Sequence, residues 1–344
     1  MSLADEIAAV RGSVAISTSD HLVCVRITGA DAHELLDRVS PRQLFVRAGQ
    51  MLHTLLLDEA GKPIADVYIC CDDDDYVVIA DGTTGAALAA YLAEHAQGLS
   101  VQIDDLAADH GFVSVDGPYA WELIADITSP DIIGVPYLGF FRDDRFVCYR
   151  AGKTGEFGYD LLAPRDKLAA LHDRLLSVGG RLDARTVGRD AIDLCALEAG
   201  FFNVRRHVRD GLTPVELQLQ WRVTAGRTYR GSEAVARHRK APRGRVAMIA
   251  APRELSIDAG VMLDGERVGS VLDAAWSHTR GEVIGLAMLD IAISHAGLHG
   301  FSCGDASVRT LSAPAINNRS LYVDPQRHSF ATRDQLQLPP LVRV

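Results

Sequence analysis

The sequence lacks a long uncharged apolar run, and positive charge is in the minority. No run reaches the roughly 18 residues that a membrane-spanning helix needs, and the apolar stretch 283–293 is interrupted by Asp290. Residues 1–17 carry Asp5, Glu6 and Arg11 and have no apolar centre, which is unlike a signal peptide. Lys and Arg number 35 against 45 Asp and Glu, giving a formal net charge of −10. Non-specific nucleic-acid binding depends on neutralising phosphates, so we expect a soluble, cytoplasmic protein with no nucleic-acid partner and no membrane partner.

Cysteine is scarce, and its spacing matches no familiar site. None of the 6 cysteines forms a CxxC pair, so the cysteine spacing of zinc-ribbon and thioredoxin-like sites is missing. We expect buried or half-buried thiols in a reducing compartment, and no metal site. No GxGxxG follows a strand and no GxSxG occurs. Gly152-Lys153-Thr154 is no phosphate-binding loop, because Val147 stands where the first glycine belongs.

The remaining pattern is that of a mixed globular protein. With 344 residues, of which 48% are hydrophobic, the chain is long enough for two domains and possibly three. Residues 21–29 and 51–71 alternate as a strand and a hairpin, whereas 83–97 and 165–178 have helical spacing of Ala and Leu. Helices thus alternate with mostly antiparallel strand pairs, which predicts an α+β fold rather than a doubly wound sheet.

The C-terminal third has a different composition. The stretch 222–246 is rich in arginine and has little apolar periodicity, and we interpret it as an interdomain connection that uses its charges mainly in salt bridges. Strand-like runs separated by short turns follow between 245 and 312. This spacing predicts a separate small barrel or sandwich.

Three separated segments carry a resemblance to a known family. They are LLLDEAGKPIADVYI (55–69), KTGEFGYDLLAP (153–164) and ALEAGFFNVRRHVRDGLTPVELQLQW (196–221). Weaker matches are ITGADA (27–32), VDGP (115–118) and GERVGSV (265–271). In this order the segments resemble the glycine-cleavage T-protein family of tetrahydrofolate-dependent aminomethyltransferases, which includes folate-dependent demethylases. Several positions depart from the family pattern, so we expect a divergent member.

The resemblance implies a three-domain ring around a central folate cavity, with a C-terminal all-β barrel. The expected boundaries are 1–50 with 111–240 for an interleaved α+β folate-binding domain, 51–110 for a second α+β domain, and 241–344 for the barrel. The implied cofactor is tetrahydrofolate. The implied activity is that of a one-carbon transferase.

Two residues of the first hairpin are the catalytic candidates. The family's aspartate beside the folate N5/N10 edge matches Asp66, and a carboxylate suits that place because it can orient or accept a proton. The family's aromatic residue before the first motif falls on His53. Its unperturbed pKa is near 6.5, which makes it a candidate general acid or base.

The other candidates divide into cofactor-binding and donor-binding groups. Asp160 stands where the family has a glutamate that pairs with the pterin amino group and ring NH, and Lys153 replaces a family tyrosine at the start of the same motif. Trp221 and Tyr229 are further cofactor-side candidates, with core packing as the alternative. The basic candidates for binding a donor carboxylate or the folate glutamate tail are Arg205, Arg206, His207 and Arg209.

These residues predict transfer of a methyl or methylene group between a small donor and N5 of tetrahydrofolate. His53, Lys153 and the arginines are cationic or can become so, which favours an anionic donor over a lipoyl carrier protein. Two alternatives stay open. One is a non-catalytic folate-binding regulatory protein, although the KGCYxGQE segment of that family branch is missing. The other is an enzyme of this fold that no longer uses folate.

Overall fold

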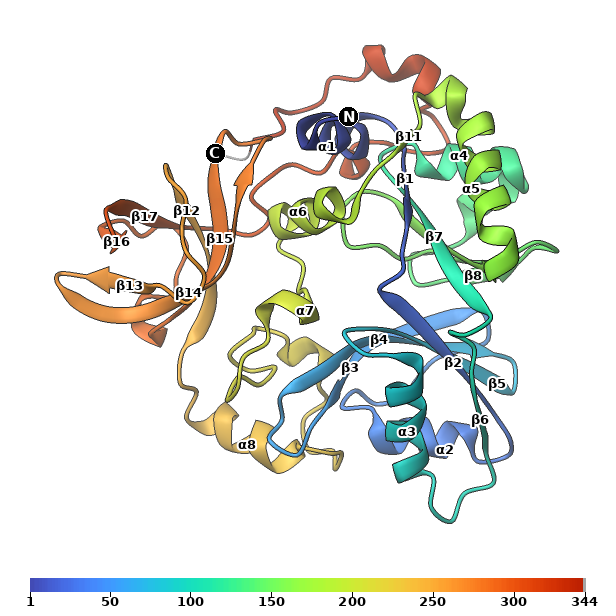
Figure 1. The fold of residues 1–344 in the computed structure, drawn as a ribbon, viewed down its shortest axis with the longest axis horizontal. Helices are drawn as coiled ribbons and strands as arrows, with labels where there is room; N and C mark the ends of the chain where they lie inside the picture. Colours follow the sequence, from blue (N-terminus) through green and yellow to red (C-terminus); the bar gives the residue numbers. More distant parts are fainter. Residues whose placement is uncertain (343–344) are drawn as a thin grey trace.

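Three β-sheets and the helices that cover them surround the middle of the molecule (Figure 1). The computed structural model describes residues 1–342. The first sheet has the strand order β11-β1-β7-β10-β9-β8. Its strands are β1 (Ala15–Thr18), β7 (His110–Asp116), β8 (Phe140–Arg142), β9 (Val147–Tyr149), β10 (Gly158–Pro164) and β11 (Arg185–Thr186).

One face of the first sheet carries a helical layer. The helices are α4 (Ala120–Ile127) and α5 (Arg165–Gly179), with the short 3-10 turns η1 (Pro130–Gly134) and η2 (Gly180–Leu182). Val113, Val115 and Leu161 point into this core, together with Leu123 and Leu175 of the helices. Because side chains alternate along a strand, the residues between them face the opposite side.

The second sheet has the order β3-β4-β5-β2-β6. Its strands are β2 (Leu22–Thr28), β3 (Gln50–Leu57), β4 (Pro63–Asp72), β5 (Asp75–Asp81) and β6 (Gln102–Asp105). Two helices, α2 (Ala32–Val39) and α3 (Gly85–His95), cover its outer face around Val67 and Val78. The inner face packs on the first sheet, where Cys70 and Ile79 share a core with Phe112 and Leu162.

Along this sheet–sheet interface, four strands change from apolar to polar on the same face. The series are Phe112, Ser114 and Asp116 on β7; Leu162 and Asp160 on β10; Cys70, Tyr68 and Asp66 on β4; and Val77, Ile79 and Asp81 on β5. The apolar ends close the interface. The polar ends therefore converge on one region between the sheets.

Residues 189–240 link the sheets to the barrel. This segment contains α6 (Arg189–Ala199), α7 (Val204–His207), the turn η3 (Gln220–Arg222) and α8 (Ser232–Lys240). An apolar cluster joins Leu55 of β3 to Leu197 and Phe202 of this segment and to Leu286 of the barrel. At the N-terminus, α1 (Leu3–Gly12) begins with a Ser2–Asp5 capping box and packs beside α6.

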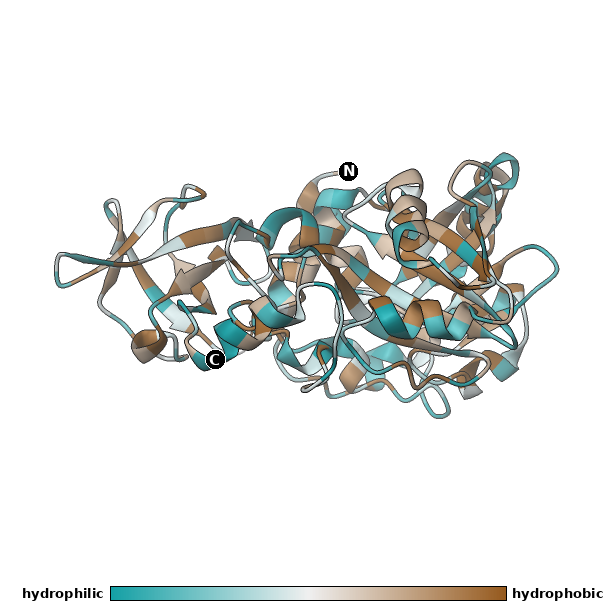
Figure 2. Cartoon of the chain, turned by 90° about the horizontal axis from the view of Figure 1, so that it is seen from below, coloured by the Kyte–Doolittle hydropathy of each residue, from teal (hydrophilic) through white to brown (hydrophobic). Residues whose placement is uncertain are grey.

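The C-terminal region forms a closed barrel in the order β12-β15-β14-β13-β16-β17. The strands are β12 (Arg245–Ala251), β13 (Gly260–Leu263), β14 (Glu266–Ser277), β15 (Glu282–Leu289), β16 (Phe301–Cys303) and β17 (Ala306–Leu311), with the turn η4 (Ile291–Ile293) after β15. The tail then returns through η5 (Arg319–Leu321) and η6 (Phe330–Gln335) to the first sheet, where Phe330 meets Tyr119 edge-on at 5.4 Å. Apolar residues follow the inner strands in Figure 2, and the outer loops are mainly hydrophilic.

The structure confirms the α+β fold and the C-terminal barrel. It moves two of the expected boundaries: β2 pairs with β5 and β6, so 22–39 belongs with the second sheet, and the tail after β17 packs on the first sheet rather than on the barrel. All six cysteines are buried and free. Within residues 1–342, no helix has both the length and the apolar character to span a membrane.

Candidate active site

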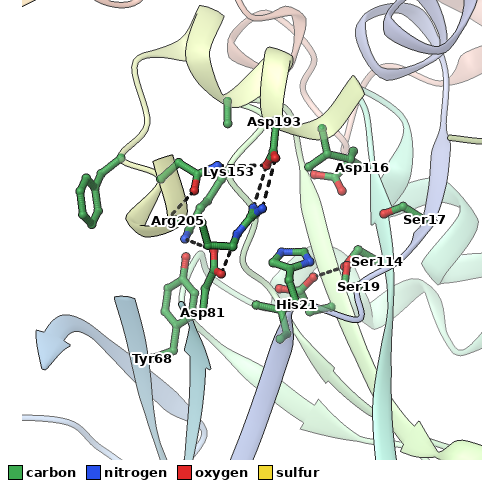
Figure 3. Close-up of a pocket in the computed structure, with 17 residues that line it drawn as sticks. Ser17, Ser19, His21, Tyr68, Asp81, Ser114, Asp116, Lys153, Asp193 and Arg205 are labelled. Carbon is green, nitrogen blue, oxygen red and sulfur yellow. Dashed lines mark hydrogen bonds and ion pairs between the residues drawn. The ribbon is translucent and has the colours of Figure 1, made fainter. Parts of the chain in front are cut away.

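A small cavity lies where the polar strand ends converge, with a volume of about 60 Å³. The second sheet supplies Tyr68 and Asp81, and the first sheet supplies Ser114, Asp116 and Asp160 (Figure 3). The loop before β10 adds Lys153, and α6 and the segment after it add Asp193, Phe202, Asn203 and Arg205. The cavity is thus enclosed by segments that are distant in the sequence.

Asp66 adjoins this cavity through Lys153, and two cations and an imidazole contact it. Its Oδ1 accepts hydrogen bonds from Arg222 Nη1 at 2.7 Å and from His53 Nε2 at 2.7 Å, and the Lys153 Nζ lies 2.8 Å from its Oδ2. Burial alone would raise the pKa of Asp66, but Lys153, His53 and Arg222 hold it well below its usual range. Asp66 is therefore a fixed negative charge at neutral pH and a poor proton acceptor.

His53 is neutral in this environment. It is 4% exposed, and burial lowers its pKa to about 4 despite the adjacent Asp66. Because Nε2 faces the ionised carboxylate, the proton of the neutral ring lies on Nε2 and is donated to Asp66. The ring stacks on Tyr68 with centroids 4.3 Å apart. His53 therefore orients Asp66 and Tyr68 in the resting site.

A chain of alternating charges continues from Asp66 along the cavity wall. The Lys153 Nζ lies 3.6 Å from Asp81 Oδ2, and Arg205 donates from Nε to Asp81 Oδ1 at 2.9 Å. Arg205 also donates from Nη2 to Asp193 Oδ1 at 2.8 Å. These contacts tie β4, β5, α6, α7 and the loop before β10 together (Figure 3).

The opposite wall of the cavity holds two carboxyl groups that accept hydrogen bonds from hydroxyl groups. Ser114 donates a short hydrogen bond to Asp160, and Thr154 Oγ1 donates to Asp116 Oδ1 at 2.9 Å. Within residues 1–342, no Lys, Arg or His nitrogen forms an ion pair with either group. Burial raises the pKa of Asp160 to about 6, and burial together with Asp160 raises that of Asp116 to about 7.

The structure brings several of the predicted site residues together. Asp66, His53, Lys153 and Arg205 form one connected network, and Asp160 lies on the facing wall. Trp221 is 58% exposed and lies beside the network, with its ring centroid 6.1 Å from that of His53. It lines a neighbouring cavity of about 330 Å³, which shares Phe202 with the first.

The remaining basic candidates contact carboxylates of the barrel region and do not line the first cavity, which corrects the expected donor site. His207 does line the neighbouring cavity beside Trp221. Arg206 donates from Nε to Asp273 Oδ2 at 2.9 Å, and His207 Nε2 lies 3.1 Å from the same oxygen. Arg209 contacts Asp258 in the same way, at 3.2 Å. Asp273 is 2% exposed, and a buried carboxylate needs paired charge. These three residues therefore hold α7 and the loop after it against the barrel.

Tyr229 also departs from its expected place. It packs in the apolar cluster that joins β3, the linking segment and the barrel, and it lines a separate surface groove with Arg227 and Arg239. The alternative of core packing is the one that the structure supports. Tyr229 does not reach the Asp66 network.

Several residues of the site are not among those that the sequence predicts. Arg222 belongs to the arginine-rich connecting stretch, yet it is 2% exposed and binds Asp66. Tyr68 has a signal in the period-two spacing, since it lies two residues from Asp66 on the same strand. Asp116 has no predicted site residue beside it in the sequence.

The fold and site define a class: two α+β units with a charged cavity between their sheets, joined to a C-terminal β-barrel. The family model described as the GCVT N-terminal domain matches residues 1–227. The chain belongs to this family of one-carbon transferase enzymes.

Similar proteins agree with this assignment. An aminomethyltransferase from Frankia alni is 30% identical over 297 residues, which cover 83% of this chain and 80% of that protein. One from Thermotoga neapolitana is 23% identical over 296 residues, covering 84% and 82%. The crystal structure of the glycine cleavage system aminomethyltransferase T from Bartonella henselae superposes with a TM-score of 0.82 at 21% identity, covering 92% of this chain and 90% of that one. This last match shows the same fold.

Proposed function

We propose that this protein transfers a methyl or methylene group between a small donor and N5 of tetrahydrofolate. The observation that carries the proposal is the contrast between two carboxylates at one cavity. Asp160 has no ion-pair partner within the described residues, whereas Lys153, Arg222 and a hydrogen bond from the neutral His53 hold Asp66 ionised. The first suits a ligand edge rich in N–H donors, such as the pterin edge. The second suits the place where positive charge develops during transfer.

The residues present fit a reduced folate at its two ends. The carboxylate of Asp160 keeps an acceptor oxygen beyond its bond from Ser114, and the Tyr68 hydroxyl is buried without a hydrogen-bond partner within residues 1–342. The neighbouring cavity beside Trp221 has room for the aromatic remainder of the ligand.

Tetrahydrofolate supplies the nitrogen that exchanges the one-carbon unit, and the chain supplies position and charge. Asp160 holds the far end of the ligand, and Asp66 places a permanent negative charge behind the reacting centre. His53 and Arg222 fix the Asp66 carboxylate through two hydrogen bonds to Oδ1. A preorganised charge of this kind stabilises a cationic transition state without solvent reorganisation.

The donor that we propose is a small anion bound by Lys153. An ammonium has three N–H donors, and the contact with Asp81 at 3.6 Å is too long for a hydrogen bond. Lys153 therefore retains capacity for a donor carboxylate, whereas Arg205 is engaged by both Asp81 and Asp193. A lipoyl carrier protein is not favoured, because such a donor has no need of an internal cation.

Calorimetry with tetrahydrofolate under anaerobic conditions tests the proposal. We expect saturable binding, and a rise in thermal stability of roughly 2.7 kcal/mol at a ligand concentration of about 100 times Kd. Asp160→Asn should weaken binding by at least about tenfold, whereas Asp166→Asn on the exposed start of α5 should not change it. No binding at millimolar ligand contradicts the proposal and favours an enzyme of this fold that no longer uses folate. Binding without any one-carbon transfer favours a regulatory folate-binding protein.

A further inference from the structure

Two carboxyl groups share one face of the first sheet, and neither has a counter-cation in the described part of the chain. In the register of β7 and β10, Asp116 is opposite Gly158 and Ser114 is opposite Asp160. Asp116 and Asp160 are therefore diagonal neighbours on the same face, a relationship that places Cα atoms about 7–8 Å apart. Asp116 is 4% exposed, and both residues line the cavity.

Other buried acids in the described chain have a basic partner. Asp66, Glu156, Glu198 and Asp273 each contact an arginine, at distances of 2.7, 3.2, 2.9 and 2.9 Å. Asp116 instead receives a hydroxyl hydrogen bond from Thr154 and lies close to Gly152 and Gly158, where a Cβ would come within 3.2 and 3.1 Å of its Oδ1. The backbone thus leaves room for this carboxyl group but provides no charge to balance it.

A second observation at the same cavity points to a ligand. Tyr68 is 7% exposed, and within residues 1–342 its hydroxyl has no hydrogen-bond partner. It points into the cavity from β4 (Figure 3). A buried hydroxyl without a partner destabilises the folded protein. The cost is recovered when a ligand supplies the missing hydrogen bond.

We propose that Asp116 is a second ligand-binding carboxyl group, which works with Asp160 as a pair that holds one proton when a reduced pterin is bound. This inference rests on the proposed function. In the complex, the ionised Asp160 accepts from the N–H groups of the amino-pyrimidinone edge. The protonated Asp116 donates its O–H to an acceptor atom of the same ring, and Tyr68 contacts the ring from the facing wall.

Electrostatic interactions favour a single proton shared between Asp116 and Asp160. Two ionised carboxylates at this separation repel each other in a site that a bound heterocycle would dry further, whereas two neutral carboxyls would give up the charge-assisted bonds to the N–H donors. Burial and the neighbouring Asp160 also raise the pKa of Asp116 to about 7, which favours its protonated form below neutral pH.

The charged groups that face the pair are engaged by other partners. Arg11 and Glu156 are ion-paired with each other, and Asp193 is ion-paired with Arg205. The cation of Lys153 is held by Asp66. Burial lowers the pKa of His21 to about 4 and raises that of Cys195 to about 12, and burial raises that of Tyr68 well above its ordinary value.

The test measures the affinity of 5-formyltetrahydrofolate, a stable reduced folate, at about pH 6.5 and about pH 8 by calorimetry. A proton required on a group with a pKa of about 7 makes binding about tenfold weaker at the higher pH. Asp116→Asn keeps a neutral N–H donor. It should bind with the pH 6.5 affinity of the unaltered protein at both pH values.

Asp116→Ala, which lacks the donor, should bind about tenfold more weakly at pH 6.5. Tyr68→Phe should weaken binding and keep the pH dependence. Affinity of the unaltered protein that is independent of pH, or an Asp116→Asn variant that keeps the tenfold fall, contradicts this inference while leaving the proposed function intact. No binding by the unaltered protein at either pH contradicts both.

Discussion

Asp66 and Asp81 lie directly opposite each other on the paired strands β4 and β5, and the Lys153 ammonium lies between them. Like charges in directly opposed positions of a sheet are destabilising. Lys153 relieves this repulsion, at 2.8 Å from Asp66 and 3.6 Å from Asp81. The same ammonium also forms part of the cavity wall, so it joins the stability of the second sheet to the proposed chemistry.

Replacing Lys153 by Met should raise the KM for an anionic donor by at least about tenfold and change kcat less, because the ammonium contributes chiefly to donor binding. The free energy of unfolding should fall as well, since Asp66 and Asp81 lose the ammonium charge that lies between them. Lys153→Arg should restore most of the stability, and Lys167→Met, at a side chain that is 68% exposed, serves as the control. Steady-state kinetics and thermal unfolding measure both effects. An unchanged KM together with turnover of a lipoyl carrier would instead identify the carrier protein as the donor.

Asp66→Asn should reduce turnover by about 100-fold or more while affinity for folate stays within a few-fold, because the change removes the charge and keeps the shape. It also leaves the buried Arg222 guanidinium without its carboxylate, so the free energy of unfolding should fall by about 3 kcal/mol. Rapid-quench kinetics separates the chemical step from binding. A variant with near-normal turnover would show that Asp66 is structural.

His53 should not set the pH dependence of turnover near neutrality, because its pKa is lowered to about 4. In the unfolded chain the imidazole titrates near 6.5, so the unfolded state binds the proton first. Stability should therefore fall as pH drops from about 6.5 to about 4. His53→Gln should make this loss smaller, as followed by urea unfolding at several pH values. A turnover profile with a break near pH 6.5 that disappears in His53→Gln would instead assign His53 as the general acid or base.

The sequence predicts the architecture better than the site. Alternation and helical spacing identify most strands and helices, and the three family-like segments predict the ring and the barrel. Short local patterns do not reveal which elements meet. Arg11 illustrates this limit: its guanidinium contacts Glu198 at 2.9 Å and Glu156 at 3.2 Å, across separations of 187 and 145 residues. No feature of α1 alone indicates these partners.

The basic cluster after α6 shows why composition alone misassigns function. Arg205, Arg206, His207 and Arg209 are nearly consecutive, yet they serve different neighbours: Arg205 contacts Asp81 at the cavity, and the others contact Asp273 or Asp258 of the barrel. A helical turn and the loop after it direct successive side chains outward in different directions. Only the placement of the acidic partners decides which of them reaches the site.

Arg206→Ala should weaken the attachment of the barrel without altering catalysis. Arg206 forms two hydrogen bonds with Asp273, and a double-mutant cycle with Asp273→Asn should give a coupling energy of about 1–2 kcal/mol in urea unfolding. Donor KM and folate affinity should stay within about twofold. A large rise in KM would return Arg206 to the donor site.

Asp116→Asn should stabilise the folded protein above neutral pH and not in acid. The pKa of Asp116 is raised from 3.8 to about 7 by burial and Asp160, so the folded state binds a proton that the unfolded state has released. Stability therefore falls as pH rises from about 4 to about 7, and the loss is complete above about 7. An amide has no charge to bury, so the variant should be more stable than the unaltered protein at about pH 8, by a few kcal/mol at most. At about pH 4 both proteins carry a neutral group and should unfold at similar temperatures.

Asp126→Asn, on the exposed side of α4 beside Arg181, provides a matched control that should not gain stability at about pH 8. Equal stability of Asp116→Asn and the unaltered protein at both pH values would mean that Asp116 is ionised at no cost, which would also remove the basis for a retained proton in the ligand site.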